Sequence, residues 1–234
     1  MHSIAPSHFI LKESTTMPRE LRFYADSANV DEISPLLENG LVHGVTTNPT
    51  ILERGNRTVL DIPALYSRWE AEGANEIFFQ TWGATTSDLR KNATRIVALG
   101  DRVVVKVPAT AAGFGAAAAL VEEGVTVLVT AVYAQAQALA AATLGVRYVA
   151  PYLGRLRDAG RDGIGEISKM QALIAGSGTD VLAASLRSPH DIVELASNGV
   201  PFFTAAPSVI LASLQSDVSD SSAAEFDAAV NRGL

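Results

Sequence analysis

The chain has 234 residues, of which 48% are hydrophobic and 18% charged, and its formal net charge is −7. This length and apolar fraction support one large α/β domain or two small ones with a substantial core. The acidic balance argues against a general attraction to nucleic acid or to anionic membranes. No cysteine is present, which excludes disulfides, thiolate metal sites and cysteine nucleophiles and suits an intracellular protein, which we expect to be cytoplasmic.

Two segments bear on targeting and membranes. Residues 1–20 lack the basic start and apolar block of a signal peptide, so we expect a flexible N-terminal extension there. Residues 125–146 contain no charged residue and are long enough to span a bilayer. However, β-branched residues fill the first third of this segment, whereas alanine with polar spacers fills the rest. A buried strand followed by a buried helix explains this change better, and we expect no membrane partner.

Short runs rich in Val, Ile, Phe and Ala alternate along the chain with segments of helical period. Such alternation predicts strands joined by helices, and therefore a parallel sheet with short connections. The predicted strands cover residues 21–28, 44–49, 76–82, 103–108, 125–132, 148–153, 181–185 and 202–207.

Several of the intervening helices carry their own start signals. Asn29 followed by Glu32 predicts a capping box. Ser188 is followed by Pro189, which suits the first helical position, and by Asp191 three residues on. These signals place helix starts shortly after the first and seventh predicted strands.

Eight strand–helix units within residues 21–234 predict a single-domain (β/α)8 TIM barrel. A doubly wound open sheet is the alternative, but no Gly-rich phosphate turn follows the first strand. The nearest imitation, "GFGAAAA" (113–119), has no lysine after its glycines and is assigned to helix packing. An extra C-terminal helix with apolar positions between 223 and 230 is expected either to cap the barrel or to pack on a neighbouring subunit.

Polar residues interrupt or follow the apolar strands near their carboxyl ends, where a TIM barrel gathers its chemistry. A purely structural core has no need for polar side chains, because each buried polar group requires a hydrogen-bond partner. Their convergence from seven strands is stronger evidence for a site than any single member. They are Asp26, Thr47, Asn48, Gln80, Lys106, Thr130, Tyr152, Arg155, Ser185 and Arg187.

Lys106 lies in the apolar run "VVVKVPAT" (103–110). In a dry barrel an ammonium loses hydration, so we expect its pKa to fall and a neutral amine to be populated. Such an amine attacks a ketone or aldehyde and forms a Schiff base, which then serves as an electron sink. The structural alternative is a lysine that reaches the strand end or pairs with Asp26.

Schiff-base chemistry also requires proton transfers and a means of holding the substrate. Asp26 and Tyr152 are suitable acid/base types, and Gln80 and Thr130 are suited to hold a water. Arg155, Ser185 and Arg187 would suit a phosphate group. The four histidines show no metal-ligand spacing, so we expect neither a metal nor a cofactor.

Five stretches carry a family resemblance, and they occur in order along residues 24–189: "YADSANVDEI", "GVTTNPTIL", "VVVKVPAT", "TAVYAQAQALAAATLGVRYVAPYLGR" and "VLAASLRSP". The chain resembles the transaldolase family, most closely its small fructose-6-phosphate aldolase-like branch. The resemblance implies a cofactor-independent class I aldol mechanism on sugar phosphates, with Lys106 as the Schiff-base lysine and Asp26 as the acid/base. It implies that Asn48 and Thr130 position the substrate and the catalytic water, and that Arg155, Ser185 and Arg187 bind phosphate. It also implies a homo-oligomer, a pentamer or a decamer.

The residues at positions 80 and 152 help to distinguish between the two branches of the family. Classical transaldolases carry Glu and Phe where this chain has Gln80 and Tyr152, so the resemblance favours fructose-6-phosphate aldolase. Gly154–Arg155 and Arg187 lean toward transaldolase instead. Two other interpretations stay open, namely a deoxyribose-phosphate-type aldolase and a non-catalytic sugar-phosphate-binding barrel in which Lys106 pairs with phosphate.

Overall fold

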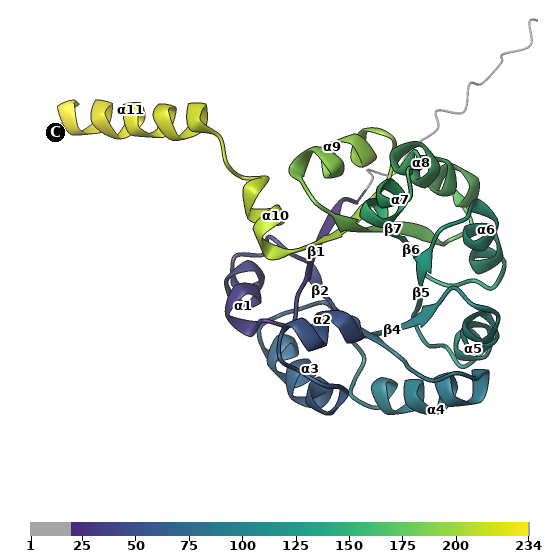
Figure 1. Ribbon diagram of the computed structural model, residues 1–234. Coiled ribbons are helices and arrows are strands. Elements are labelled where there is room, and N and C mark those ends of the chain that lie inside the picture. The colour runs from purple at the N-terminus through teal and green to yellow at the C-terminus, as the bar shows by residue number, and fades with distance from the viewer. Residues whose placement is uncertain (1–19, 234) are drawn as a thin grey trace, which may run out of the picture.

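The computed structural model describes residues 20–233, and within them a closed barrel of eight parallel strands forms in the order β1 to β8 (Figure 1). The predicted barrel is thus confirmed, and every predicted strand is present. The prediction for the N-terminal extension falls almost entirely on residues 1–19, outside the described residues. The strands are β1 (Arg22–Asp26), β2 (Gly44–Thr46), β3 (Glu76–Gln80), β4 (Val103–Pro108), β5 (Val127–Val132), β6 (Tyr148–Pro151), β7 (Asp180–Leu186) and β8 (Phe202–Ala205).

Helices surround the barrel and connect successive strands (Figure 1). The uncharged segment 125–146 forms β5 and α6, as predicted. Among the described residues, none of the helices combines the length and apolar character needed to cross a bilayer. The helices are α1 (Val30–Glu38), α2 (Pro49–Arg54), the 3-10 helix η1 (Val59–Asp61), α3 (Ile62–Ala71), α4 (Thr86–Val97), α5 (Ala111–Glu122), α6 (Gln135–Thr143), α7 (Leu153–Asp158), α8 (Gly163–Ile174), α9 (Pro189–Ser197), α10 (Pro207–Ala212) and α11 (Asp217–Gly233).

The strands bury both of their faces, in two separate cores. The larger core lies between the strands and the helices, and the smaller one fills the barrel interior. The interior core includes Tyr24, Phe78, Leu128, Tyr148 and Phe202. Because successive side chains of a strand point to opposite faces, these residues fix which positions of each strand face the barrel axis.

The two predicted helix starts have different outcomes. At α9 the predicted start is confirmed, since Ser188 caps the helix, and the Asp191 carboxylate accepts from the Ser188 N–H at 3.1 Å and so completes a capping box. At α1 Asn29 does cap the helix, accepting a hydrogen bond from the backbone of residue 31, but the predicted capping box with Glu32 is wrong. The reason is that the Ser27 hydroxyl already accepts from the Asn29 N–H, at 3.1 Å, and itself donates to Glu32.

The glycines of "GFGAAAA" lie in the first turns of α5, where close packing explains them. A Cβ on Gly113 would lie 1.8 Å from the carbonyl oxygen of Pro108, at the end of β4. The helix therefore approaches the strand through a residue that has no side chain. This agrees with the packing role expected for the segment.

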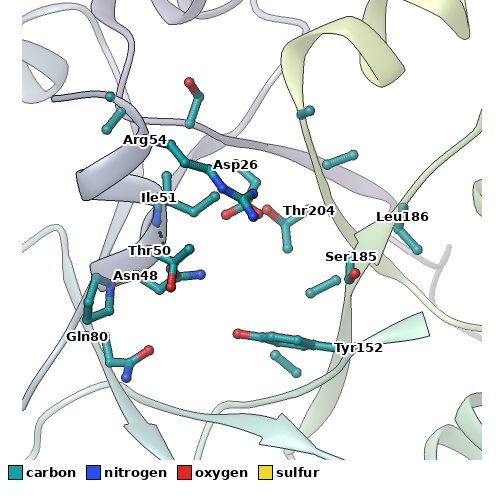
Figure 2. A pocket seen from close by; sticks show the side chains of 18 of the residues that line it. Asp26, Asn48, Thr50, Ile51, Arg54, Gln80, Tyr152, Ser185, Leu186 and Thr204 are labelled. Carbon is teal, nitrogen blue, oxygen red and sulfur yellow. Dashed lines mark hydrogen bonds between the residues drawn. The ribbon is translucent and has the colours of Figure 1, made fainter. Parts of the chain in front are cut away.

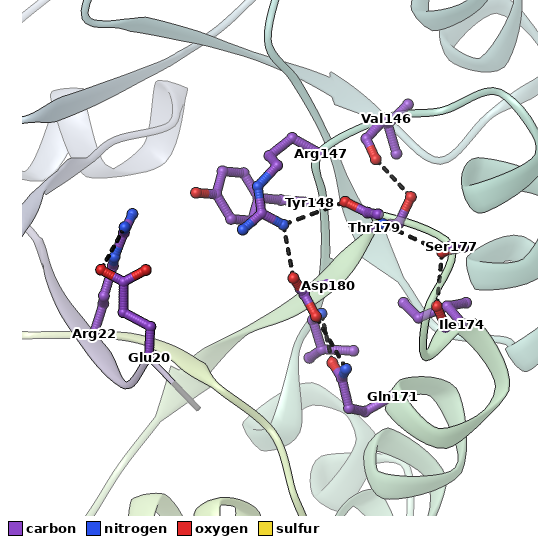
Figure 3. A network of polar contacts seen from close by, with 12 residues as sticks. Glu20, Arg22, Val146, Arg147, Tyr148, Gln171, Ile174, Ser177, Thr179 and Asp180 are labelled. Atoms are coloured by element: carbon purple, nitrogen blue, oxygen red, sulfur yellow. Dashed lines mark hydrogen bonds and ion pairs between the residues drawn. The ribbon is translucent and has the colours of Figure 1, made fainter. Parts of the chain in front are cut away.

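The amino-terminal end of the barrel is closed by a polar network. Glu76 accepts hydrogen bonds from the hydroxyls of Tyr24, at 2.5 Å, and Tyr148, at 2.9 Å. Figure 3 shows the neighbouring pairs, in which Arg22 contacts Glu20 and Arg147 contacts Asp180. Burial and Glu76 raise the pKa of Tyr148 to about 12, so the phenol stays protonated as a donor. Since this network holds the bottom of the barrel, we look for the site at the opposite end.

The C-terminal helix α11 extends away from the barrel (Figure 1). None of its residues is buried, and Val218, Phe226 and Val230 are 76%, 69% and 62% exposed. The possibility that it caps the barrel is therefore wrong. Its short connection from α10 carries it outward, so its apolar side chains remain without a partner among the described residues.

Candidate active site

The alternation of β4 points Lys106 into the barrel. Val103, Val105 and Val107 pack in the outer core, whereas Val104 belongs to the interior core. Lys106, two residues after Val104, therefore faces the interior, and the residue is 4% exposed. The prediction of a lysine enclosed by the barrel is confirmed by this placement.

A cavity of about 1110 Å³ opens at the carboxyl ends of the strands. Leu128, Ala150 and Leu182 contribute apolar lining to it. Figure 2 shows several of the polar side chains that converge on it from different strands. Eight of the predicted site residues line this cavity: Asp26, Asn48, Gln80, Lys106, Tyr152, Arg155, Ser185 and Arg187.

Burial controls the charge of the lysine. Loss of hydration lowers the pKa of Lys106 below its ordinary value, and the negative charge of Asp26 acts in the opposite direction. The net shift is downward. A neutral amine is the form that attacks a carbonyl carbon, so this environment favours a nucleophile over an ion pair.

Asp26 is held by two threonines that the sequence interpretation missed. The Thr46 hydroxyl donates to the Asp26 carboxylate at 2.7 Å, and Thr46 and Thr204 share a further hydrogen bond of 2.5 Å. Both threonines are buried. The alternation of side chains along each strand could have indicated them, because Thr204 lies two residues after inward-facing Phe202. These contacts fix the orientation of the carboxylate at the edge of the cavity.

Thr47 and Thr130 do not line the cavity directly. Thr47 follows inward-facing Thr46, so it points to the opposite face, where its hydroxyl donates to the carbonyl oxygen of Phe78 at 2.9 Å. Thr130 contacts the cavity through the Tyr152 hydroxyl, 2.8 Å away. The structure therefore brings Thr130, but not Thr47, to the other predicted residues.

Tyr152, Gln80 and Asn48 line the same cavity as the lysine. Burial raises the pKa of Tyr152, so its phenol is protonated and able to donate. Gln80 is the direct neighbour of Lys106 in the β3–β4 register. Asn48 caps α2 by accepting from the Ile51 N–H at 2.9 Å, which leaves its amide nitrogen free to donate. The three groups offer neutral hydrogen-bonding partners to a substrate or a water.

Two irregularities in the backbone lie beside these groups. Ala131 and Ser185 adopt left-handed conformations, with φ of 58° and 57°, where the registers of β5 and β7 shift. Such conformations are unfavourable for residues with a side chain. β-Bulges change the direction of the side chains next to them, so these two irregularities help to orient Thr130 and Ser185.

The groups suited to a phosphate lie on the β6–β7 side of the cavity. Arg187 makes a bidentate ion pair with Asp158, at 2.8 and 2.6 Å, which lowers the pKa of that carboxyl group. A Cβ on Gly154 would lie 2.7 Å from both Arg187 Nε and Ser185 Oγ. The guanidinium therefore lies against the backbone of α7, in space that a larger residue would occupy.

The cavity is locally positive although the whole chain carries −7. Three acidic residues line it, Asp26, Glu32 and Asp158, against four arginines, Arg54, Arg57, Arg155 and Arg187, so the balance is positive even when Lys106 is a neutral amine. Arg54 and Arg57 had no signal in the strand pattern because they lie in and after α2. Among the described residues no cluster of His, Asp and Glu is arranged to hold a metal ion. The charge balance favours an anionic ligand.

Comparison with solved structures bears on the fold. A thiamine phosphate pyrophosphorylase from Pyrococcus furiosus superposes with a TM-score of 0.59 at 15% identity, over 82% of this chain and 88% of that chain. A mandelate oxidase mutant with a monooxide FMN adduct gives 0.56 at 17% identity, over 80% of this chain and 65% of the other. At such low identities these similarities establish the barrel architecture alone.

Sequence relatives are closer. A probable transaldolase of Hydrogenobaculum sp. is 33% identical over 203 residues, which cover 86% of this chain and 92% of the relative. A probable transaldolase of Methanococcus maripaludis is 33% identical over 209 residues, covering 88% and 95%. The sequence also matches the family described as transaldolase/fructose-6-phosphate aldolase over residues 23–232. The chain therefore belongs to this family of aldolase-type enzymes.

Proposed function

We propose that the protein transfers or releases a dihydroxyacetone unit from a ketose phosphate such as fructose 6-phosphate, through a Schiff base on Lys106. The observation that carries the proposal is that Lys106, alone among the lysines of residues 20–233, is enclosed in the barrel, and burial lowers the pKa of its amine. The lysines at 91 and 169 are exposed, so they lack the environment that makes an amine nucleophilic at neutral pH.

In the proposed reaction the Lys106 amine adds to the ketone carbon C2 of the substrate. Loss of water from the carbinolamine gives an iminium ion. Asp26 accepts the proton of the C4 hydroxyl while the C3–C4 bond breaks, and the electron pair of that bond moves into the iminium to form an enamine. The aldose phosphate leaves as an aldehyde. Tyr152, with a water held near Thr130 and Gln80, supplies the proton donors for these steps.

The phosphate of the substrate would bind Arg155, Ser185 and Arg187. Guanidinium groups suit phosphate because they donate two hydrogen bonds in one plane. These residues lie above the β6–β7 edge of the cavity, whereas the lysine lies inside the barrel. An extended sugar phosphate would thus place its ketone end in the interior and its anionic end at the rim.

The fate of the enamine separates transfer from release. Attack on an acceptor aldehyde gives a new ketose, whereas protonation at C3 and hydrolysis give free dihydroxyacetone. We favour release, because Gln80 and Tyr152 match the aldolase branch and a phenol offers a proton that phenylalanine lacks. Gly154–Arg155 and Arg187 favour transfer, so transaldolase activity is the alternative within the same mechanism.

Borohydride reduction tests the covalent step. The enzyme is incubated with fructose 6-phosphate or dihydroxyacetone, reduced, digested and mapped by mass spectrometry, with the Lys169→Met variant as a control. We expect one adduct, on Lys106, in both proteins. An adduct elsewhere would remove Lys106 from its role. Binding of fructose 6-phosphate without an adduct would favour a non-catalytic barrel, and turnover of deoxyribose 5-phosphate alone would favour the other aldolase type.

We also propose that the protein is a homo-oligomer, a pentamer or a decamer. The exposed apolar side chains of α11, Phe226 and Val230 among them, support this because no part of the described chain covers them. Light scattering after size-exclusion chromatography measures the mass. A particle of the monomer mass, 24.6 kDa, would contradict the proposal.

A further inference from the structure

Arg54 is the basic residue of the cavity wall that the proposed reaction leaves unused. It ends α2, lines the cavity and, in Figure 2, extends toward Asp26 and Thr204. The strand before it is β2, and the strand before Arg155 is β6. In the closed order of eight strands these two lie across the barrel from each other. Arg54 and Arg155 therefore approach the cavity from opposite rims.

Both arginines are without partners in the part of the chain that the structure describes. Neither side chain forms an ion pair or a hydrogen bond with residues 20–233. By contrast, Arg187 is paired with Asp158, and Arg57 lies 4.0 Å from Asp61. A guanidinium is permanently charged and carries five N–H donors. Two such groups facing one cavity repel each other, and an anion between them would remove that repulsion.

The backbone that carries Arg54 is firmly placed. The next residue, Gly55, packs so closely on Ala28 that a Cβ would lie 2.9 Å from the Ala28 Cβ. The Arg57 N–H donates to the Leu52 carbonyl at 2.8 Å and closes the turn after α2. The position of the Arg54 Cα is thus fixed against the β1–α1 connection, and the side chain is the part that is free to reach a ligand.

We propose that Arg54 is a substrate-binding residue that donates hydrogen bonds to the phosphate monoester of the substrate, from the rim opposite Arg155. This proposal rests on the proposed function, since it takes the ligand to be a sugar phosphate. Arg54 extends toward Asp26 (Figure 2) but forms no ion pair with it, so its guanidinium keeps its donors for a ligand. Arg54 would therefore determine selectivity for phosphorylated over neutral substrates and would not change the nucleophile.

The test compares Arg54→Gln and Arg54→Lys with Arg95→Gln. Arg95 is a matched control because it is also exposed and without a carboxylate partner among the described residues, but it lies on α4 outside the cavity. Binding of inorganic phosphate is measured by calorimetry, KM is measured with fructose 6-phosphate, and borohydride trapping is measured with unphosphorylated dihydroxyacetone. Circular dichroism verifies that each variant is folded.

We expect Arg54→Gln to weaken phosphate binding and to raise KM for fructose 6-phosphate on the order of tenfold, the effect of one charge-assisted hydrogen bond. Arg54→Lys should recover part of the loss, Arg95→Gln should match the unmodified enzyme, and trapping of dihydroxyacetone should be unchanged in all variants. Unchanged phosphate binding in Arg54→Gln would overturn the proposal, as would equal losses with phosphorylated and neutral substrates. Failure of trapping in every protein would instead refute the Schiff-base function, so the two failures are distinguishable.

Discussion

The close contact at Gly154 makes Gly154→Ala an informative perturbation. Ordinary contacts begin at 3.4 Å, whereas the new Cβ would lie 2.7 Å from Arg187 Nε and from Ser185 Oγ. Both atoms must therefore move by about 0.7 Å or adopt other rotamers. The guanidinium is the end of a long side chain and moves readily, so the fold tolerates the change. The proposed phosphate site should not tolerate it, because hydrogen bonds weaken steeply with distance and angle.

Two small terms set the expected change in the free energy of unfolding. The Arg187–Asp158 pair is 55% and 49% exposed, and such a surface pair contributes about 0.2 to 1 kcal/mol. Replacing a helical glycine by alanine is favourable by about 0.4 to 1 kcal/mol. These terms oppose each other, so the urea midpoint should change little. Loss of a charge-assisted hydrogen bond to phosphate costs about 1.5 to 3 kcal/mol, so KM for fructose 6-phosphate should rise about tenfold or more.

A double-mutant cycle tests whether the effect passes through the arginine. KM for fructose 6-phosphate is measured for Gly154→Ala in the native background and again in Arg187→Gln, with Gly115→Ala in α5 as a helical glycine control away from the cavity. The rise in KM should largely disappear in the Arg187→Gln background. An equal rise in both backgrounds, or an equal loss with unphosphorylated substrates, would refute the reasoning.

Three further predictions concern single groups. Tyr152→Phe should suppress release of free dihydroxyacetone more than transfer to erythrose 4-phosphate, because it removes the phenolic proton; equal losses in the two assays would contradict this role. Lys106→Met should abolish trapping yet raise the urea midpoint, since burial disfavours the ammonium group of the lysine and an apolar side chain has no such cost; a lower urea midpoint than that of the native protein would contradict it. Burial and Arg22 lower the pKa of His43, so the folded state binds fewer protons than the unfolded one. Its contribution to stability is therefore present above the ordinary pKa, near 6.5, and is lost as the pH falls through the lowered value. His43→Gln should flatten the decrease of the urea midpoint on acidification, and an unchanged slope would exclude the histidine.

The barrel was predictable from the sequence because each strand forms a compact apolar run that burial on both faces requires. The site was predictable in outline for the same reason, since a polar residue such as Lys106 or Asp26 is conspicuous in such a run. The alternation of side chains along a strand distinguishes neighbouring residues of the same type. Thr46 and Thr47 are the same residue type, yet inward-facing Thr46 bonds to Asp26 and outward-facing Thr47 bonds to a strand carbonyl.

Features set by loops and tertiary contacts were not predictable from periodicity. Arg54 lies at the end of a short helix, where no strand pattern indicates which way its side chain points. The alternative cap at α1 depends on the Ser27 hydroxyl, whose competition for the Asn29 N–H requires a particular loop geometry. The orientation of α11 depends on the path of the connection after α10, which hydrophobic periodicity does not specify.

The lysine and the arginines of the cavity lie at different depths and therefore have different electrostatic environments. Lys106 is enclosed, and burial outweighs the opposing effect of Asp26 on its pKa. None of the rim arginines is a cause of that shift, so desolvation controls the proposed nucleophile, and exposed guanidinium groups form the proposed anion site. Because an exposed cation keeps its hydration until a ligand arrives, the rim can hold several positive charges at small cost to stability. A substrate with an uncharged carbonyl end and a phosphate end fits this arrangement, with the carbonyl in the interior and the phosphate at the rim. A ligand charged at both ends would have to place an ion in the apolar interior.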